Sequence, residues 1–286
     1  MLNGLAIGAP PDPLGPLGQN WTLITFSPNG LRASGFEGYI DMLRTNFRGA
    51  GGIRIDHAFG LSRLWVIPEG EPSSHGACLS YPFDELMRLV CLEAYLAGAI
   101  VVGEDLRTAP IDFSLSVADK ALMGMRVMWF ERAADDGFVG HQDYDELSLA
   151  TTSTHDTATV AGWWSGDDVA LSDSLQRFPA GIPREIEEPR RAWDRGLLWS
   201  TFAQPDPRPT PEETDRVVDA ALSHIAGSNA SLAILPFVTQ AALRSCWHAR
   251  RSRKGSRTSS SRDDKRRTPV RSEERARRSR SKTRVA

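Results

Sequence analysis

Three acidic side chains, Asp56, Glu104 and Asp156, each closely follow a short strand-forming stretch, namely "GGIRI", "AIVVG" and "LATTST". The intervals of 48 and 52 residues each hold one to two βα units of about 30 residues, which would bring all three acids to one rim of a parallel sheet or barrel. Grouped like charges are unfavourable unless chemistry or a cation uses them. Paired carboxylates in different environments suit glycosyl transfer, in which one attacks or stabilises the anomeric carbon and the other supplies a proton.

The neighbouring residues predict different roles for two of these acids. Arg54 lies on the same strand face as Asp56 and would hold that carboxylate ionised and oriented. Glu104 follows the most apolar stretch, where desolvation would raise its pKa and suit it to proton transfer. Taken singly, Asp56 also fits a helix N-cap or loop anchor, Asp156 fits a cap of the following helix, and Arg54 fits a bridge to a surface acid.

The elements that would position these acids alternate along the chain. Apolar periodicity predicts helices over about 36–47, 83–98 and 211–225, the last with a capping box between Thr210 and Glu213. Apolar runs predict strands at 53–55, 99–102, 149–154 and 231–237. The first thirty residues are rich in Pro and Gly and predict a long irregular loop. This order is typical of a parallel α/β sheet or barrel.

Composition narrows the class of protein. Hydrophobic residues make up 41% of the 286, enough for a substantial core, and the sequence contains neither a long apolar run nor a signal-peptide pattern. We therefore predict a cytoplasmic protein with no membrane association. The three cysteines, Cys78, Cys91 and Cys246, lack CxxC spacing, which predicts thiols rather than a disulfide framework or a zinc site.

The C-terminal end differs from the rest of the chain. From Ala249 onward it holds sixteen Lys or Arg and four Asp or Glu with almost no apolar residues, which predicts a disordered tail over 241–286. Such a tail could bind nucleic acid electrostatically. The absence of Phe, Tyr and Trp from Ala249 onward and the acidity of the remaining chain make nucleic acid an unfavoured partner.

Eight short motifs then occur in a specific order: "GAPPD", "GQNW", "IRIDH", "IP.G", "YPFDEL", "VVGEDL", "STHD" and "AGWW". Over roughly 8–234 the sequence resembles the 4-alpha-glucanotransferases, also called amylomaltases or disproportionating enzymes, of glycoside hydrolase family 77. The resemblance implies a variant (β/α)8 barrel of the alpha-amylase clan. It also implies transfer of an α-1,4-glucan segment of maltodextrin or starch to another sugar's 4-hydroxyl, with retention and without a metal or organic cofactor.

The same resemblance implies roles for individual residues. Asp56 matches the nucleophile, Glu104 the general acid/base and Asp156 the transition-state stabiliser. Arg54 and His155 match residues that hold the nucleophile and the sugar at the cleavage site.

Further matches lie nearer the N-terminus. Gln19 and Trp21 match a substrate-lining loop whose tryptophan stacks a glucose ring, and Asp12 matches the acid of "PPD". Trp163 and Trp164 are expected to pack in the core or in a loop instead, and His224 is expected to be a surface or satisfied residue.

Departures from the family pattern lead to a further expectation. The chain begins only a few residues before "GAPPD", and the resemblance stops near Phe237, so 1–240 is predicted to be a partial catalytic barrel that lacks its first strands. Arg107, three residues after Glu104, would lower the pKa of that acid. The activity of the chain by itself is left open, as are two alternatives: an alpha-glucan hydrolase of the same clan, and a non-catalytic glucan-binding remnant indifferent to Glu104→Gln.

Overall fold

The structure is a computed structural model that describes residues 1–12, 17–105, 122–175 and 184–236. The predicted tail over 241–286, together with Arg107 and Cys246, lies outside the described residues. In the described part no helix combines the length and apolar character needed to cross a membrane. The cytoplasmic location stays a prediction. Neither Cys78 nor Cys91 forms a disulfide among these residues.

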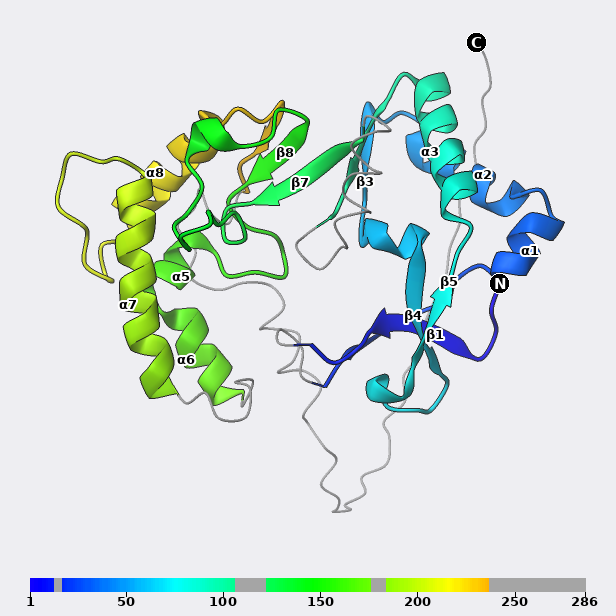
Figure 1. Cartoon of the computed structure of the whole chain (residues 1–286), viewed down its shortest axis with the longest axis horizontal. Coiled ribbons are helices and arrows are strands. Elements are labelled where there is room, and N and C mark those ends of the chain that lie inside the picture. The colour runs from blue at the N-terminus through cyan, green and yellow to red at the C-terminus, as the bar shows by residue number, and fades with distance from the viewer. Residues whose placement is uncertain (13–16, 106–121, 176–183, 237–286) are drawn as a thin grey trace, which may run out of the picture.

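A parallel sheet of five strands carries the predicted acids (Figure 1). Its order is β3-β6-β7-β8-β9, and every neighbouring pair is parallel. The strands are β3 (Gly52–Ile55), β6 (Ile100–Gly103), β7 (Met123–Val127), β8 (Ser148–Thr151) and β9 (Leu232–Ile234). The parallel α/β arrangement is confirmed, and β7 is a strand that the sequence patterns did not predict.

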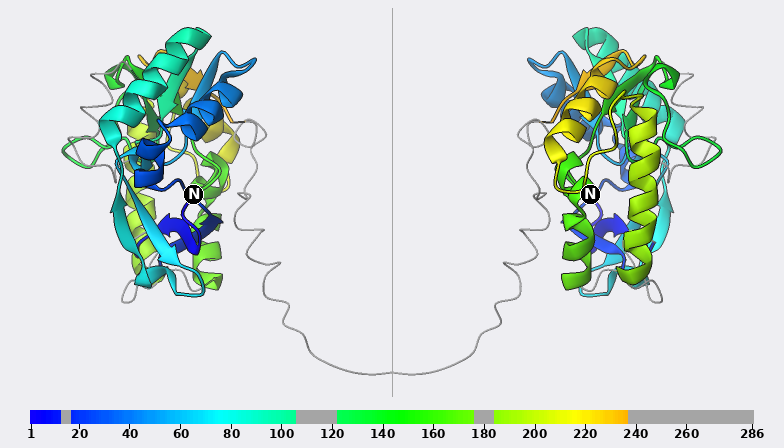
Figure 2. Two further views of the ribbon diagram at one scale, coloured as in Figure 1. Left: turned by 90° about the vertical axis from the view of Figure 1, so that its right-hand side faces the viewer. Right: turned by 90° about the vertical axis from the view of Figure 1, so that its left-hand side faces the viewer.

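The helices form two groups at opposite ends of the sheet (Figures 1 and 2). One group consists of α1 (Pro28–Ala33), α2 (Glu37–Phe47) and α3 (Phe83–Ala97). The other consists of α5 (Val160–Ser165), α6 (Asp167–Ser174), α7 (Arg184–Thr201) and α8 (Thr214–Ala226). The predicted helices α2, α3 and α8 are confirmed, whereas α7 contains Pro189 and escaped prediction.

The prediction of a long irregular loop at the N-terminus is wrong. The first thirty residues contain β1 (Leu5–Ala9), β2 (Gln19–Leu23) and the start of α1. With β4 (Arg63–Pro68) and β5 (Ala77–Ser80) they form an antiparallel sheet in the order β2-β1-β4-β5. The Pro and Gly residues that suggested a loop lie mostly between the strands, since β1 contains only Gly8 and β2 contains neither residue type. Strand β1 is held in place by pairing with β4, about sixty residues away.

Close approach of backbones fixes the β1–β2 pair at Gly8. The register shifts between Ile7 and Gly8, and a Cβ placed on Gly8 would lie 1.9 Å from the carbonyl oxygen of Gln19. Only glycine fits there, because any side chain would force the two strands apart.

Two apolar cores hold the helices to the sheet. Tyr39, Leu43 and Val90 are buried between α2, α3 and β3. The other core lies among α5, α7 and α8 and includes Trp163 and Trp164, which are 8% and 0% exposed. The prediction that this tryptophan pair packs in the core is confirmed.

Helix α8 shows two differences from the sequence predictions. It begins at Thr214, and the Glu213 carboxylate accepts the backbone N–H of Thr210 at 2.8 Å, so half of the predicted capping box forms one turn ahead of the helix. The expectation that His224 is a surface or satisfied residue is wrong, because it is 6% exposed and its Nδ1 has no hydrogen-bond partner among the described residues.

Candidate active site

The carboxyl ends of two neighbouring parallel strands bring Asp56 and Glu104 together. Strands β3 and β6 pair in register from Gly52 opposite Ile100 to Ile55 opposite Gly103. Asp56 and Glu104 directly follow the last pair, so both side chains emerge at the same edge of the sheet. Asp56 is not a side-chain N-cap, since the short 3₁₀ turn that follows begins at Ala58 without a side-chain cap.

Arg54 lies between the two acids. Its Nη1 is 2.5 Å from Oδ1 of Asp56, and its Nη2 donates to Oε2 of Glu104 at 3.0 Å. The same Glu104 oxygen accepts the backbone N–H of His57 at 2.8 Å. Arg54 therefore contacts Asp56, as its position on the same strand face indicated, and it also bridges to Glu104, which the sequence did not predict.

The two acids differ in environment and in pKa. Burial raises the pKa of Glu104, as does its hydrogen bond with the Asp56 carboxylate. Burial acts in the same direction on Asp56, but the hydrogen bond from Glu104 and the charges of Arg54 and His155 outweigh it and lower the pKa of Asp56. The side chains are 23% and 69% exposed, respectively. The arrangement favours a protonated Glu104 beside an ionised Asp56.

The third predicted acid lies in the loop after β8, next to His155. Nε2 of His155 is 3.1 Å from Oδ2 of Asp156, and the backbone N–H of Asp156 donates to Oγ1 of Thr154 at 3.2 Å. Helix α5 is capped by Thr159, so Asp156 does not have the capping role that the sequence left open. The charge of His155 contributes to the lowered pKa of Asp56, so His155 lies within electrostatic reach of that carboxylate.

The predicted sugar-binding residues Gln19 and Trp21 lie on β2. The indole N–H of Trp21 donates to Oε1 of Gln19 at 3.0 Å, and the Trp21 ring meets His57 edge-on with 5.2 Å between centroids. Because His57 directly follows Asp56, this contact brings β2 to the site. Asp12 lies in the connection between β1 and β2.

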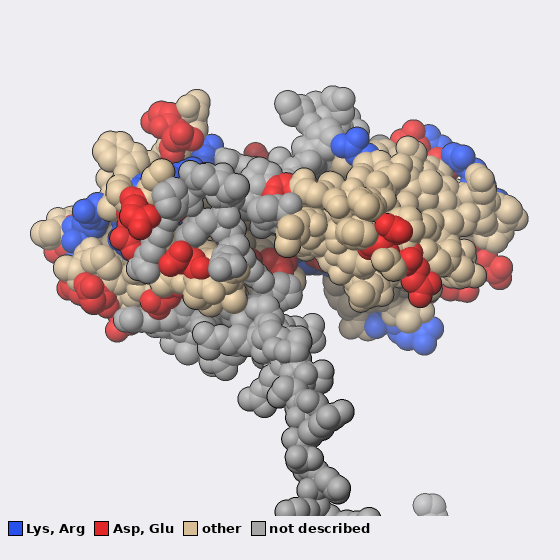
Figure 3. All heavy atoms as spheres, turned by 90° about the horizontal axis from the view of Figure 1, so that it is seen from below, with Lys and Arg blue, Asp and Glu red and all other residues tan. Residues whose placement is uncertain are grey.

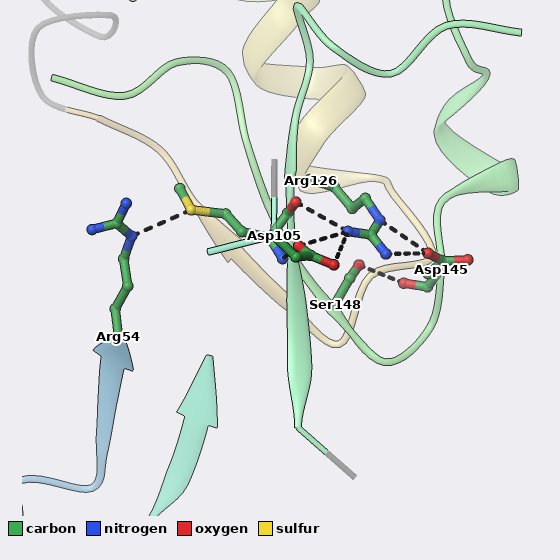
Figure 4. Close-up of polar contacts among 6 residues, drawn as sticks. Arg54, Asp105, Arg126, Asp145 and Ser148 are labelled. Carbon is green, nitrogen blue, oxygen red and sulfur yellow. Dashed lines mark hydrogen bonds and ion pairs between the residues drawn. The ribbon is translucent and has the colours of Figure 1, made fainter. Parts of the chain in front are cut away.

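Three residues that the sequence analysis did not single out lie next to Arg54 and Glu104 and are linked to one another by hydrogen bonds: Asp105, Met125 and Arg126. Asp105 is buried and accepts the backbone N–H of Met125 at 2.9 Å, and Nε of Arg54 lies 3.4 Å from the Met125 sulfur (Figure 4). The sequence signal that could have pointed to Asp105 is its position directly after Glu104 in "GED". Among the described residues no group of three or more His, Cys, Asp or Glu side chains is placed to hold a metal ion.

Comparison with known proteins relates this geometry to a family. A family model described as 4-alpha-glucanotransferase matches residues 2–245. The chain belongs to this family. It is 40% identical over 210 residues to the 4-alpha-glucanotransferase of Haemophilus influenzae, and 35% identical over 217 residues to that of Mycobacterium bovis. These alignments cover 73% and 72% of the chain and 30% of each relative. The chain thus spans about a third of the length of these family members.

Solved structures agree with this assignment. An amylomaltase from Corynebacterium glutamicum aligns with a TM-score of 0.72 at 28% identity, covering 81% of this chain and 34% of that one. An amylomaltase from Streptococcus agalactiae in complex with acarbose aligns with a TM-score of 0.62 at 17% identity, over 82% and 42% of the two chains, and supports the fold alone. The five-stranded sheet with its helices is part of the family's α/β barrel.

Proposed function

We propose that this site transfers an α-1,4-glucan segment from one maltodextrin to the 4-hydroxyl of another sugar. One observation carries the proposal: a single arginine, Arg54, holds two carboxylates whose pKa values move in opposite directions. A nucleophile must be ionised and a proton donor must be protonated, and this arrangement supplies both at one strand edge.

The proposed reaction takes place in two displacements. Asp56 attacks the anomeric carbon while Glu104 gives its proton to the leaving oxygen, which releases the first sugar and leaves a glycosyl ester on Asp56. Glu104, now ionised, takes the proton of the acceptor's 4-hydroxyl, whose oxygen displaces Asp56. An inverting enzyme needs roughly 6.5–9.5 Å between its two carboxyl groups. Retaining enzymes place theirs only about 5–5.5 Å apart, and the binding of Asp56 and Glu104 to the one guanidinium of Arg54 favours this shorter spacing.

The remaining predicted residues are assigned to sugar binding and charge stabilisation. His155 and Asp156 form a polar pair beside Asp56, positioned to hold the sugar ring as positive charge develops at its anomeric carbon. Trp21, anchored by Gln19 and set edge-on to His57, offers a ring face for stacking. Asp12 is assigned to the same loop region on the resemblance alone.

The surface charge is compatible with an uncharged substrate. On the face shown in Figure 3, basic side chains of the described residues lie in separate small groups and acidic ones are spread over both halves. A neutral glucan is recognised by hydrogen bonds and stacking and needs no continuous basic patch of the kind that nucleic acid requires.

The test is incubation of the purified protein with maltotriose and separation of the products. Transfer gives glucose together with maltotetraose and longer chains, and Glu104→Gln abolishes both. Glu93→Gln is the matched control, because Glu93 is a buried, arginine-bound glutamate remote from the site. Glucose and maltose without longer products would replace transfer by hydrolysis, and glucan binding without turnover would indicate a non-catalytic remnant.

A further inference from the structure

Asp105 is a buried acid next to Glu104 that the proposed reaction does not use. Its side chain is 3% exposed, and burying a carboxylate is unfavourable unless hydrogen bonds and opposite charge compensate it. Here both are present. Oδ1 accepts the backbone N–H of Met125 at 2.9 Å and Nη1 of Arg126 at 3.1 Å, and Oδ2 lies 3.2 Å from the same guanidinium nitrogen.

In the hydrogen bond to Met125, the Asp105 side chain takes the place of a backbone acceptor just beyond the last residue pair of β6 and β7. The pairing of β6 with β7 ends at Gly103 opposite Gly124, and the next β7 residue would lack a backbone acceptor from β6. The Asp105 carboxylate supplies that acceptor. The β6 chain can therefore leave the sheet at Glu104, with that residue turned toward Arg54 and Asp105 turned into the interior.

Arg126 fixes the Asp105 carboxylate from the neighbouring strand. It contacts Asp105 with Nη1, while Nε and Nη2 donate to Oδ2 of Asp145 at 2.9 and 2.7 Å (Figure 4). The carbonyl oxygen of Asp145 in turn accepts the Ser148 hydroxyl, which ties the cluster to β8. A planar guanidinium held on both sides cannot rotate without losing charged hydrogen bonds.

The same cluster extends to Arg54 through Met125. The backbone of Met125 is bound by Asp105, and its sulfur lies 3.4 Å from Nε of Arg54. Arg54 also contacts both candidate catalytic acids. Displacing Asp105 would therefore alter the site by two routes, directly through the adjacent Glu104 and indirectly through Met125 and Arg54.

We infer that Asp105, clamped by Arg126, is a positioning residue that sets the orientation of Glu104 and of Arg54. The effect of Asp105 on turnover rests on the proposed function. Its effect on the position of Glu104 can be measured without any activity, because the backbone N–H of His57 donates to Oε2 of Glu104 at 2.8 Å. The amide signal of His57 therefore reports where Glu104 lies and whether it is protonated, with or without catalysis.

The experiment follows the His57 amide by NMR in the full chain, recording its hydrogen-exchange rate and its chemical shift against pH. In Asp105→Asn, which keeps an acceptor for Met125 but loses the charge that holds Arg126, we expect exchange at His57 about tenfold faster and a displaced titration midpoint. Arg126→Lys keeps the charge but loses the planar fork, and should give a smaller change of the same sign. Unchanged exchange and midpoint at His57 in both variants would overturn the inference.

A matched control separates positioning from general destabilisation. Glu93→Gln weakens another buried carboxylate–arginine contact and should leave the His57 signal unaltered; an equal change there would also overturn the inference. If the wild-type protein transfers glucan, Asp105→Asn should lower kcat by about tenfold to a hundredfold with KM little changed. If the wild-type protein shows no transfer, the proposed function fails, and the His57 amide still decides the positional role.

Discussion

Two arginine–carboxylate contacts in this molecule look alike and differ in charge balance. Between α2 and α3, Arg44 donates to both oxygens of Glu93 at 2.9 Å, one cation for one anion. At the edge of the parallel sheet, Arg54 serves both Asp56 and Glu104, one cation for two anions. The helix contact is neutral as a unit, whereas the sheet-edge cluster carries an excess negative charge that a proton relieves.

This difference is the reason why we propose acid–base chemistry at only one of the two places. The neutral pair of Arg44 and Glu93 holds two helices together. In the sheet-edge cluster, burial and the neighbouring Asp56 raise the pKa of Glu104, which favours binding of a proton to the more buried acid. Charge left uncompensated at a strand end therefore distinguishes the candidate catalytic cluster from the structural contact.

The largest expected effect comes from removing the ionisable group at each place. Glu104→Gln keeps the shape but cannot exchange a proton, and transfer from maltotriose should fall about a thousandfold with little change in Tm. Glu93→Gln should lower Tm and leave kcat near the wild-type value. The comparison breaks if both variants lose activity to the same extent at a temperature where both are folded.

Removing the arginine at each place should give the next largest effect. Arg54→Met leaves Asp56 and Glu104 without their shared cation, so kcat/KM should fall about a hundredfold. The pKa of Glu104 should rise further, because the charge of Arg54 lowers it. Arg44→Met is the control and should leave the pH dependence of kcat/KM unchanged. An unshifted alkaline limb in Arg54→Met would contradict the shared-cation account.

The buried histidine His224 extends the comparison to the pH dependence of stability. Burial, with a smaller contribution from His141, lowers the pKa of His224 from 6.5 to about 4. Since the unfolded chain binds this proton more readily, stability is fully present above pH 6.5 and is lost as pH falls toward 4. Between pH 7 and pH 5 the loss should be about 2 kcal/mol in the free energy of unfolding.

The measurement for His224 is urea unfolding at several pH values. His224→Phe, which suits the surrounding rings of Tyr144 and Phe202, should lose this part of the pH dependence. His75→Gln replaces an exposed histidine and should keep the wild-type dependence. A wild-type slope in His224→Phe would show that other groups cause the acid destabilisation.

The smallest expected effect is the shape of the pH profile itself. Because Asp56 must be ionised and Glu104 protonated, kcat/KM should fall about tenfold per pH unit on either side of its optimum. The acid limb should have its midpoint below 3.8, the ordinary value for Asp, and the alkaline limb above 4.5, the ordinary value for Glu. An alkaline midpoint at or below 4.5 in the initial rates with maltotriose would remove the distinction between Glu104 and an ordinary glutamate.

The sequence predicted the acids better than the framework that surrounds them. Asp56 and Glu104 each follow a short apolar strand, a local pattern that shows directly in the residues. The β1–β4 pairing joins segments about sixty residues apart and leaves no periodicity in either strand. The Asp105–Arg126 contact depends on how β6 and β7 align. Neither contact follows from composition, because both are created by tertiary structure.

Gly8 illustrates how far such a dependence extends. It has no functional group, yet a methyl group there would collide with the Gln19 carbonyl and drive β2 away from β1. Strand β2 carries Trp21, so the displacement would reach the ring proposed to stack a sugar before it reached any acid. In a mutational scan for glucan transfer, we expect Gly8 to tolerate as few replacements as the carboxylates do. Losses at Gly8 would appear first in substrate affinity. The missing side chain of Gly8 in β1 is what allows β2, and with it the ring of Trp21, to lie where it does.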